Sequence, residues 1–273
     1  MLEKITAAFN LLIDNELRTT CGTWHLKCNI SAPMPFHSFK ALKKITSRTD
    51  SALLHAFKDD EFDQIYPASV SALSTCHWSP VNVCRMAAQF LVTDPGTRVL
   101  DIGCGPGKFC VIGATTTQGH FTGVEQRKRL VKTACELVEC HQIPRVEIRH
   151  GNITQINFRE FDAFYIFNPF QENIMPALRI DYDVELEPQL YTDYTAHVQQ
   201  QLMRMPMTTR VVSYCGDDGE IPACYACEKT AFTGKLKLWV KKHPAPAYAS
   251  AAQSYSKENS RDIPVGVGPF ALA

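Results

Sequence analysis

The chain has 273 residues, a length that suits one α/β domain with an accessory segment. Hydrophobic residues make up 45%, enough to fill a core, and 28 acidic residues balance 28 basic ones. A neutral chain has no overall electrostatic footprint for nucleic acid or for an acidic membrane surface. No apolar run approaches the roughly 20 residues that span a bilayer, and no signal-peptide pattern is evident. The eleven scattered cysteines are typical of reduced thiols, so we expect a cytoplasmic protein that does not associate with membranes.

The first 77 residues are expected to form a helical cap. Ile5, Phe9, Leu12 and Ile13 recur at helical spacing there, whereas the later chain alternates between strand and helix patterns. The tail from residue 243 onward is rich in Ala, Pro, Ser and Gly, and we expect it to be flexible or strap-like. The periodicity therefore separates a cap and a tail from a central domain.

Strand-like and helix-like patterns alternate between residues 81 and 240. The apolar run at residues 161–167 is nearly continuous, which is typical of a strand buried on both faces. A two-residue turn at Thr233-Gly234 is expected to join the last two strands. In the last strand, Lys241 and the lysines before it are expected to face water. We expect helices over residues 81–92, 108–116, 126–141 and 190–203, and strands over residues 98–102, 121–125, 146–149, 161–167, 210–214, 226–232 and 235–240.

A glycine-rich turn lies between the first strand and the helix that follows it. Gly103, Gly105 and Gly107 let the backbone turn sharply and approach a ligand closely. Asp101 places a carboxylate at the carboxyl end of the strand, where open α/β sheets bind ligands. The spacing is G-x-G-x-G, and Lys108 stands where the last glycine of a dinucleotide-binding G-x-G-x-x-G would be. A carboxylate in this place repels phosphate and attracts an amine or a sulfonium.

The stretch Asp-Ile-Gly-Cys-Gly-Pro-Gly resembles motif I of the class I S-adenosylmethionine-dependent methyltransferases. The resemblance extends over residues 78–241 and implies S-adenosylmethionine as the cofactor. It also implies an α/β, Rossmann-like, doubly wound seven-stranded sheet, mostly parallel, with one antiparallel strand from a C-terminal hairpin. The predicted division is a helical N-terminal cap over 1–77, a cofactor-binding core over 78–242 and the tail over 243–273.

Several positions match the cofactor-binding parts of that family. Glu125 ends the second strand 22 residues after Gly103, and an acid at this distance accepts hydrogen bonds from ribose hydroxyls. Asn152 stands where many members carry the acid that bonds the adenine amino group. The resemblance implies that Asp101 holds the methionine amine, directly or through water. The predicted cofactor set is Trp78, Asp101, Gly103, Cys104, Gly105, Gly107, Glu125, Gln126, Asn152, Ile153 and Asn168.

Asn168-Pro169-Phe170 follows the fourth strand and resembles the Asn-Pro-Pro-Tyr/Phe motif of amino-group methyltransferases, with one proline missing. In that motif, two oxygens accept hydrogen bonds from the acceptor nitrogen and the aromatic ring packs on the substrate. In-line methyl transfer depends on such orientation. We therefore expect Asn168, Pro169 and Phe170 to position the acceptor. Glu172 is a candidate general base, and His77 is a candidate neighbour of the transferred methyl group.

The acceptor is expected to be a nitrogen on a protein side chain or a small molecule, and the neutral charge disfavours nucleic acid. The alternative is a catalytically inactive cofactor-binding or partner-docking module, because the Asn-Pro motif is shortened and Asn152 departs from the family pattern. Cys224 and Cys227 form one C-x-x-C with no second pair, so no metal site is expected.

Overall fold

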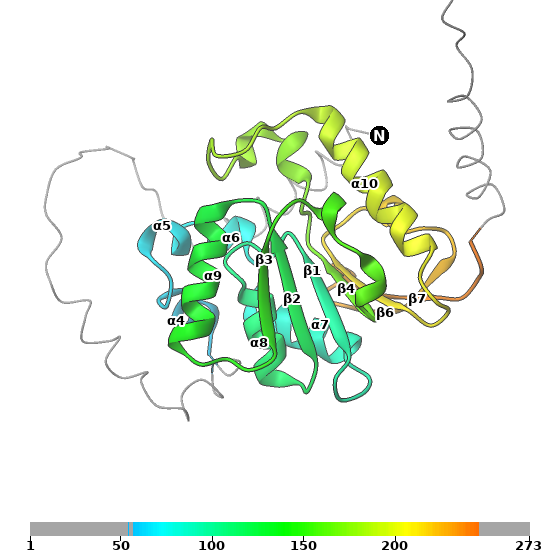
Figure 1. Cartoon of the computed structure of the whole chain (residues 1–273), viewed down its shortest axis with the longest axis horizontal. Helices are drawn as coiled ribbons and strands as arrows, with labels where there is room; N and C mark the ends of the chain where they lie inside the picture. The colour runs from blue at the N-terminus through cyan, green and yellow to red at the C-terminus, as the bar shows by residue number, and fades with distance from the viewer. Residues whose placement is uncertain (1–53, 55–56, 246–273) are drawn as a thin grey trace, which may run out of the picture.

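Seven strands form the sheet at the centre of the computed structural model, which describes residue 54 and residues 57–245 (Figure 1). Their order across the sheet is β3-β2-β1-β4-β5-β7-β6. Strands β1 to β5 pair in parallel, and β7 is antiparallel to both of its neighbours. This confirms the predicted fold. The strands are β1 (Arg98–Ile102), β2 (His120–Glu125), β3 (Val146–His150), β4 (Ala163–Ile166), β5 (Arg210–Tyr214), β6 (Tyr225–Ala231) and β7 (Leu236–Lys241).

Helices cover both faces of this sheet (Figure 1). All four residues of β4 are buried, as its apolar run predicted. Tyr165 stacks on Phe109 of α8 at 3.9 Å between ring centroids, on the face that α7, α8 and α9 cover. Phe164 faces the opposite side, in the apolar cluster that includes Leu202 of α10. The long helices are α7 (Val81–Leu91), α8 (Lys108–Thr116), α9 (Lys128–Cys140) and α10 (Pro188–Met203).

The order of the strands places the candidate site. The chain passes from β1 to β2 and β3 on one side, and then returns to form β4 on the other side of β1. A crevice opens at such a switch point, outside the carboxyl ends of the strands. The turn after β1, the end of β2 and the loop after β4 therefore meet at one edge of the sheet.

The observed elements agree with the predicted ones to within about three residues at each end. The largest differences concern α9 and β4. Helix α9 begins at Lys128 instead of residue 126, because the backbone at Arg127 is extended (φ −84°, ψ 110°) and its N–H donates to the Glu125 side chain. Strand β4 is restricted to Ala163–Ile166 because the predicted range included flanking loop residues.

Two expectations about the C-terminal hairpin are wrong. The loop between β6 and β7 has four residues, 232–235, because Ala231 pairs with Leu236 and leaves the intervening residues unpaired. Lys241 is buried instead of wet, and its ammonium group donates to the carbonyl oxygens of Met203 and Met205 at 2.6 Å each. These carbonyls lie at and just beyond the C-terminal end of α10, where a cation is favourable.

Much of the predicted cap lies outside the described residues, including Ile5, Phe9, Leu12 and Ile13, and so does the tail from residue 246 onward. The described part of the cap contains three short helices, α4 (Asp59–Asp63), α5 (Ala68–Ser71) and α6 (Ser74–His77). Within residues 57–245, no helix has the length and apolar character needed to cross a membrane. Over the same residues, no three His, Cys, Asp or Glu side chains are grouped so that they could hold a metal ion.

Candidate active site

A cavity of about 340 Å³ opens at the carboxyl ends of β1, β2 and β4. Its lining brings together residues that lie far apart in the sequence, from α4 to the residue after β5. It does not include Asp101, Cys104, Gly105 or Gly107, which lie beneath the surface of the glycine turn. The predicted site residues that line it are His77, Trp78, Gly103, Glu125, Gln126, Asn152, Ile153, Asn168, Pro169, Phe170 and Glu172.

Other parts of the protein fill the space that the glycines leave open. Gly105 has a φ of +53°, and a Cβ there would lie 2.5 Å from the Trp78 ring. Gly103 has a φ of +75°, and a Cβ there would lie 2.7 Å from Cβ of Pro169. Both positions therefore need glycine for conformation and for space. The turn is fixed between Trp78 before α7 and Pro169 after β4.

The backbone N–H groups of the glycine turn are already engaged within the protein. Gly103 and Cys104 both donate to the carbonyl of Val124 at 3.0 Å, and Gly107 donates to the carbonyl of Cys104 at 3.0 Å. Gly105 donates to Oε2 of Glu125 at 3.2 Å, and the remaining residue is a proline. A dinucleotide loop needs free amides to hold a pyrophosphate. This turn offers none from residues 103–107, so it does not fit a dinucleotide.

Lys108, the first residue of α8, is also unavailable to a phosphate. Its ammonium group is buried and lies 2.8 Å from carboxylate oxygens of both Asp59 and Asp63 on α4. Asp59 also accepts a hydrogen bond from the backbone N–H of Val81, at the start of α7. Sequence reasoning missed Asp59 and Asp63, which line the cavity. The signal that could have found them is an acidic pair four residues apart, which lies on one face of a helix.

Glu125 presents its carboxylate to the cavity from the end of β2. Oε1 accepts from the N–H of Arg127 at 2.8 Å, and Oε2 accepts from the N–H of Gly105 at 3.2 Å. Each oxygen has a second lone pair, so the group can still accept two hydrogen bonds from a diol. Burial raises the pKa of Glu125, while the backbone hydrogen bonds and the positive charge of Arg127 oppose that rise.

Asp101 lies behind the turn and is 4% exposed. Its Oδ2 accepts a weak hydrogen bond from the Cys110 thiol at 3.5 Å. Burial raises the pKa of Asp101 to about 7, and the nearby charge of Glu125 contributes to the rise. Asp101 does not line the cavity, so the predicted direct contact with a ligand there has no geometric support, although Asp101 lies close enough to Glu125 for the two carboxylates to interact.

Asn152 lines the cavity as the N-cap residue that precedes a short 3-10 helix, η2 (Ile153–Gln155). Its Oδ1 accepts from both the N–H and the hydroxyl of Thr154, at 3.0 and 2.9 Å. Its Nδ2 donates to the Tyr194 hydroxyl at 2.9 Å. Both lone pairs of the amide oxygen are thus engaged, and the side chain shapes the wall by capping η2. Ile153, next to it, is buried apart from its cavity-facing surface.

The residues after β4 form the opposite wall. Asn168 has a φ of +42°, a left-handed conformation that asparagine tolerates better than most residues. Pro169 packs on the glycine turn, and Phe170 packs on Tyr194 of α10 with 5.3 Å between ring centroids. The predicted motif therefore lies next to the glycine turn and faces the cavity.

His77 and Glu172 differ in how far their polar groups are engaged. Oε2 of Glu172 accepts from Arg127 at 2.9 Å and from the N–H of Ile180 at 2.8 Å. His77 lines the cavity at the end of α6, where burial and the positive charge of Arg127 lower its pKa. A neutral imidazole is able to accept a proton, whereas the carboxylate of Glu172 is already bound to a guanidinium group.

Comparisons with known proteins agree with this geometry. The model of a family described as "Methyltransferase domain" matches residues 93–190. A demethylmenaquinone methyltransferase of Bacillus cereus (strain B4264) is 26% identical over 119 residues, which are 43% of each chain. The corresponding protein of Bacillus anthracis (strain CDC 684 / NRRL 3495) is 26% identical over 113 residues, 41% of this chain and 40% of that one. The chain thus matches less than half the length of these curated relatives.

Solved structures with a similar chain course include an RNA methyltransferase from Salinibacter ruber in complex with S-adenosyl-L-homocysteine. It has a TM-score of 0.44 and 19% identity, and covers 62% of this chain and 96% of that one. TrmN from Thermus thermophilus has a TM-score of 0.46 and 11% identity, with 63% and 52% covered. The family model spans residues 93–190 of the chain, and this match and the seven-stranded sheet agree with the resemblance to class I, S-adenosylmethionine-dependent methyltransferases.

Proposed function

We propose that this protein transfers the methyl group of S-adenosylmethionine to an acceptor nitrogen on a protein side chain or a small molecule. One observation carries the proposal: a single cavity joins Glu125 at the end of β2 to Asn168, Pro169 and Phe170 after β4. The first is suited to a nucleoside and the others to an acceptor beside it. Both groups are held by the same glycine turn, because Gly105 bonds Glu125 and Gly103 packs on Pro169.

The cofactor half is proposed to hold the ribose on Glu125, with Gln126 and Ile153 beside the adenine. Glu125 is suited to this because two backbone N–H groups fix its oxygens and leave two lone pairs available. S-adenosylmethionine supplies a methyl group on a positively charged sulfur. The Trp78 ring lines the cavity, and an aromatic face contributes a favourable cation–π interaction with such a charge.

The acceptor half is proposed to orient a nitrogen through the amide oxygen of Asn168 and the carbonyl of Pro169, while Phe170 packs on the substrate. The nitrogen lone pair forms the new bond to the methyl carbon, the carbon–sulfur bond breaks, and its electron pair stays on sulfur. The nitrogen then loses a proton. We assign the acceptance of this proton to His77, because its imidazole lines the cavity and its lowered pKa keeps the ring neutral, whereas Glu172 is paired with Arg127.

Transfer of a labelled methyl group from S-adenosylmethionine into a cell extract tests the proposal. The purified protein is added to the extract, and label is followed separately in the protein, small-molecule and nucleic-acid fractions. We expect label in the protein or the small-molecule fraction, stable to the base treatment that removes methyl esters. Label in nucleic acid would contradict the acceptor class. Binding of the cofactor with no transfer in any fraction would support the inactive module instead.

A further inference from the structure

Arg127 is a buried arginine between the two halves of the site, at the residue before α9. Only 4% of its side chain is exposed. An arginine side chain cannot lose its charge in a protein, so a buried one requires partners. Two carboxylates supply them, and both belong to the segment that follows the Asn-Pro-Phe motif.

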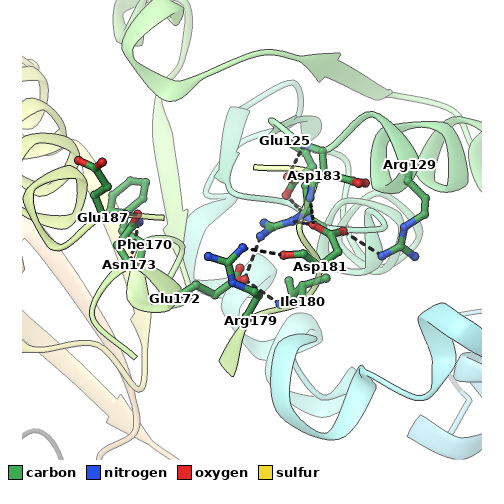
Figure 2. A network of polar contacts seen from close by, with 12 residues as sticks. Glu125, Arg129, Phe170, Glu172, Asn173, Arg179, Ile180, Asp181, Asp183 and Glu187 are labelled. Carbon is green, nitrogen blue, oxygen red and sulfur yellow. Dashed lines mark hydrogen bonds and ion pairs between the residues drawn. The ribbon is translucent and has the colours of Figure 1, made fainter. Parts of the chain in front are cut away.

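The contacts of Arg127 extend in two directions. Its backbone N–H donates to Oε1 of Glu125 at 2.8 Å. Its Nη2 lies 2.9 Å from Oε2 of Glu172, and its Nε lies 2.9 Å from Oδ1 of Asp181. Arg129 pairs with the other oxygen of Asp181 at 3.0 Å. Figure 2 shows Glu125, Glu172, Asp181 and Arg129 within this network of polar contacts.

The two acids in turn hold the backbone of their own segment. Glu172 accepts the N–H of Ile180 at 2.8 Å, and Asp181 accepts the N–H of Asp183 at 3.1 Å. Their side chains are 14% and 16% exposed, so water screens these ion pairs only partly. The charged contacts therefore connect the start of the segment to its middle as well as to Arg127.

Little else in the segment between β4 and α10 provides regular structure. Residues 171–187 contain only two three-residue 3-10 helices, η4 (Gln171–Asn173) and η5 (Pro176–Leu178). Yet this segment contributes Glu172, Leu178 and Ile180 to the cavity wall. Short helices of this kind are weak elements by themselves. The position of this wall therefore depends strongly on its ion pairs.

We propose that Arg127 is a positioning residue that couples the ribose-binding Glu125 to the wall formed by residues 171–181. The inference rests on the proposed function and extends it. Arg127 itself lines the cavity, and its Nη2 and Nε are paired with Glu172 and Asp181. It acts through Glu125, which it keeps charged and oriented, and through Glu172 and Asp181, which hold the wall of the cavity in place.

Several charged or titratable groups face Glu125, and Arg127 is the cation among them. Asp101 of β1 and Cys104 of the turn lie near enough to interact with it, and His150 of β3 is its register partner in the sheet. The positive charge of Arg127 opposes the rise in the pKa of Glu125. Removing that charge raises the pKa further, so that Glu125 becomes charged only at higher pH.

The test measures the affinity for S-adenosylmethionine by calorimetry between about pH 5 and about pH 8. We expect Arg127→Gln to weaken binding at least about tenfold at neutral pH. The acid limb of the profile, which is the pH range in which affinity falls as Glu125 becomes protonated, should move to higher pH. Arg127→Lys keeps the charge but cannot form both forked contacts. It should restore the acid limb, while amide hydrogen exchange in residues 171–187 stays faster than in the parent.

Arg129→Gln is the matched control, because it also removes an arginine bound to Asp181 but touches neither Glu125 nor Glu172. Its affinity should stay within about twofold of the parent at every pH. If Arg127→Gln does not fold, two other variants test the inference: Arg127→Lys and the double variant Glu172→Gln/Asp181→Asn. In both, amide hydrogen exchange in residues 171–187 should be faster than in the parent. Parent-like exchange in both would overturn the inference.

Binding of S-adenosylmethionine by the parent and by Arg127→Gln distinguishes failure of the proposed function from failure of the role of Arg127. A parent protein that does not bind S-adenosylmethionine would overturn the proposed function, and this inference with it. A parent that binds, together with an Arg127→Gln variant of unchanged affinity and acid limb, would overturn this inference alone.

Discussion

The two halves of the cavity are built by different means. On the cofactor side, β1, the glycine turn and α8 follow one another within 19 residues, and the available N–H groups of the turn bond within the protein. On the acceptor side, residues 171–187 have only two short 3-10 helices and are tied to Arg127 by pairs that span 45 and 54 residues. Local sequence fixes the first half, whereas long-range charge pairing fixes the second.

The largest effect is expected on the stability of the cofactor side of the cavity, at the glycine turn. Gly105→Ala places a Cβ 2.5 Å from the Trp78 ring, at a φ of +53°. We expect a loss of about 3 kcal/mol in the free energy of unfolding, from overpacking together with backbone strain. Urea unfolding measures it. Gly96→Ala is the control, because Gly96 also has a positive φ but has nothing within 4 Å of the added carbon. Equal losses in the two variants would show that Trp78 packing is unimportant.

The second prediction separates the halves by function. Asn168→Ala should reduce methyl transfer about 100-fold, because an orienting hydrogen-bond group is removed from the acceptor side. The affinity for S-adenosylmethionine should change by less than about threefold. Asn168→Gly, which suits the φ of +42°, controls for backbone strain. A parallel loss of turnover and cofactor affinity would place Asn168 in the cofactor half instead.

The third prediction concerns the pH dependence of stability. The pKa of Asp101 is raised to about 7 in the folded protein, above its value of about 3.9 when unfolded. The folded state therefore holds more protons in this window, and stability should fall as pH rises from about 4 to about 7. Asp101→Asn should flatten this slope and be more stable than the parent at about pH 8, by on the order of 2 kcal/mol. Identical slopes in thermal unfolding would refute the assignment.

The smallest effect is expected at Asn152. Its amide oxygen is engaged by Thr154. Asn152→Ala should therefore cost about 1 kcal/mol of stability through the lost cap and change cofactor affinity by less than about threefold. A loss of affinity for S-adenosylmethionine above tenfold, measured by calorimetry, would instead indicate that Asn152 contacts the adenine, as the family pattern implies. Tyr194→Phe, which removes the other partner of this amide, serves as the control.

The sequence allowed most of the fold and the cofactor half to be predicted because their signals are local. The residue ranges of β1 and α8 could be assigned from a buried strand and from the glycine turn on which the helix begins. Lys241 was misjudged because alternation along a strand does not show that the end of another helix, at Met203 and Met205, receives its ammonium group.

The parts of the site that the sequence did not indicate depend on distant partners. Lys108 was noted only as a missing glycine, yet it lies in an ion-pair cluster with Asp59 and Asp63, more than 40 residues away. Arg127 was only one residue of the helix expected over residues 126–141, although its side chain is buried between two acids. Ion pairs between distant residues produce no periodic pattern in the sequence, so they can be identified only from the tertiary structure.

The central claim is that the cavity binds S-adenosylmethionine through Glu125. Calorimetric titration of the parent and of Glu125→Gln with S-adenosylmethionine and with NAD tests it most directly. We predict that the parent binds one S-adenosylmethionine and no NAD, because no amide of the glycine turn is free for a pyrophosphate. Glu125→Gln should bind about 10- to 100-fold more weakly. Binding of NAD by the parent, or unchanged cofactor affinity in Glu125→Gln, would contradict the account.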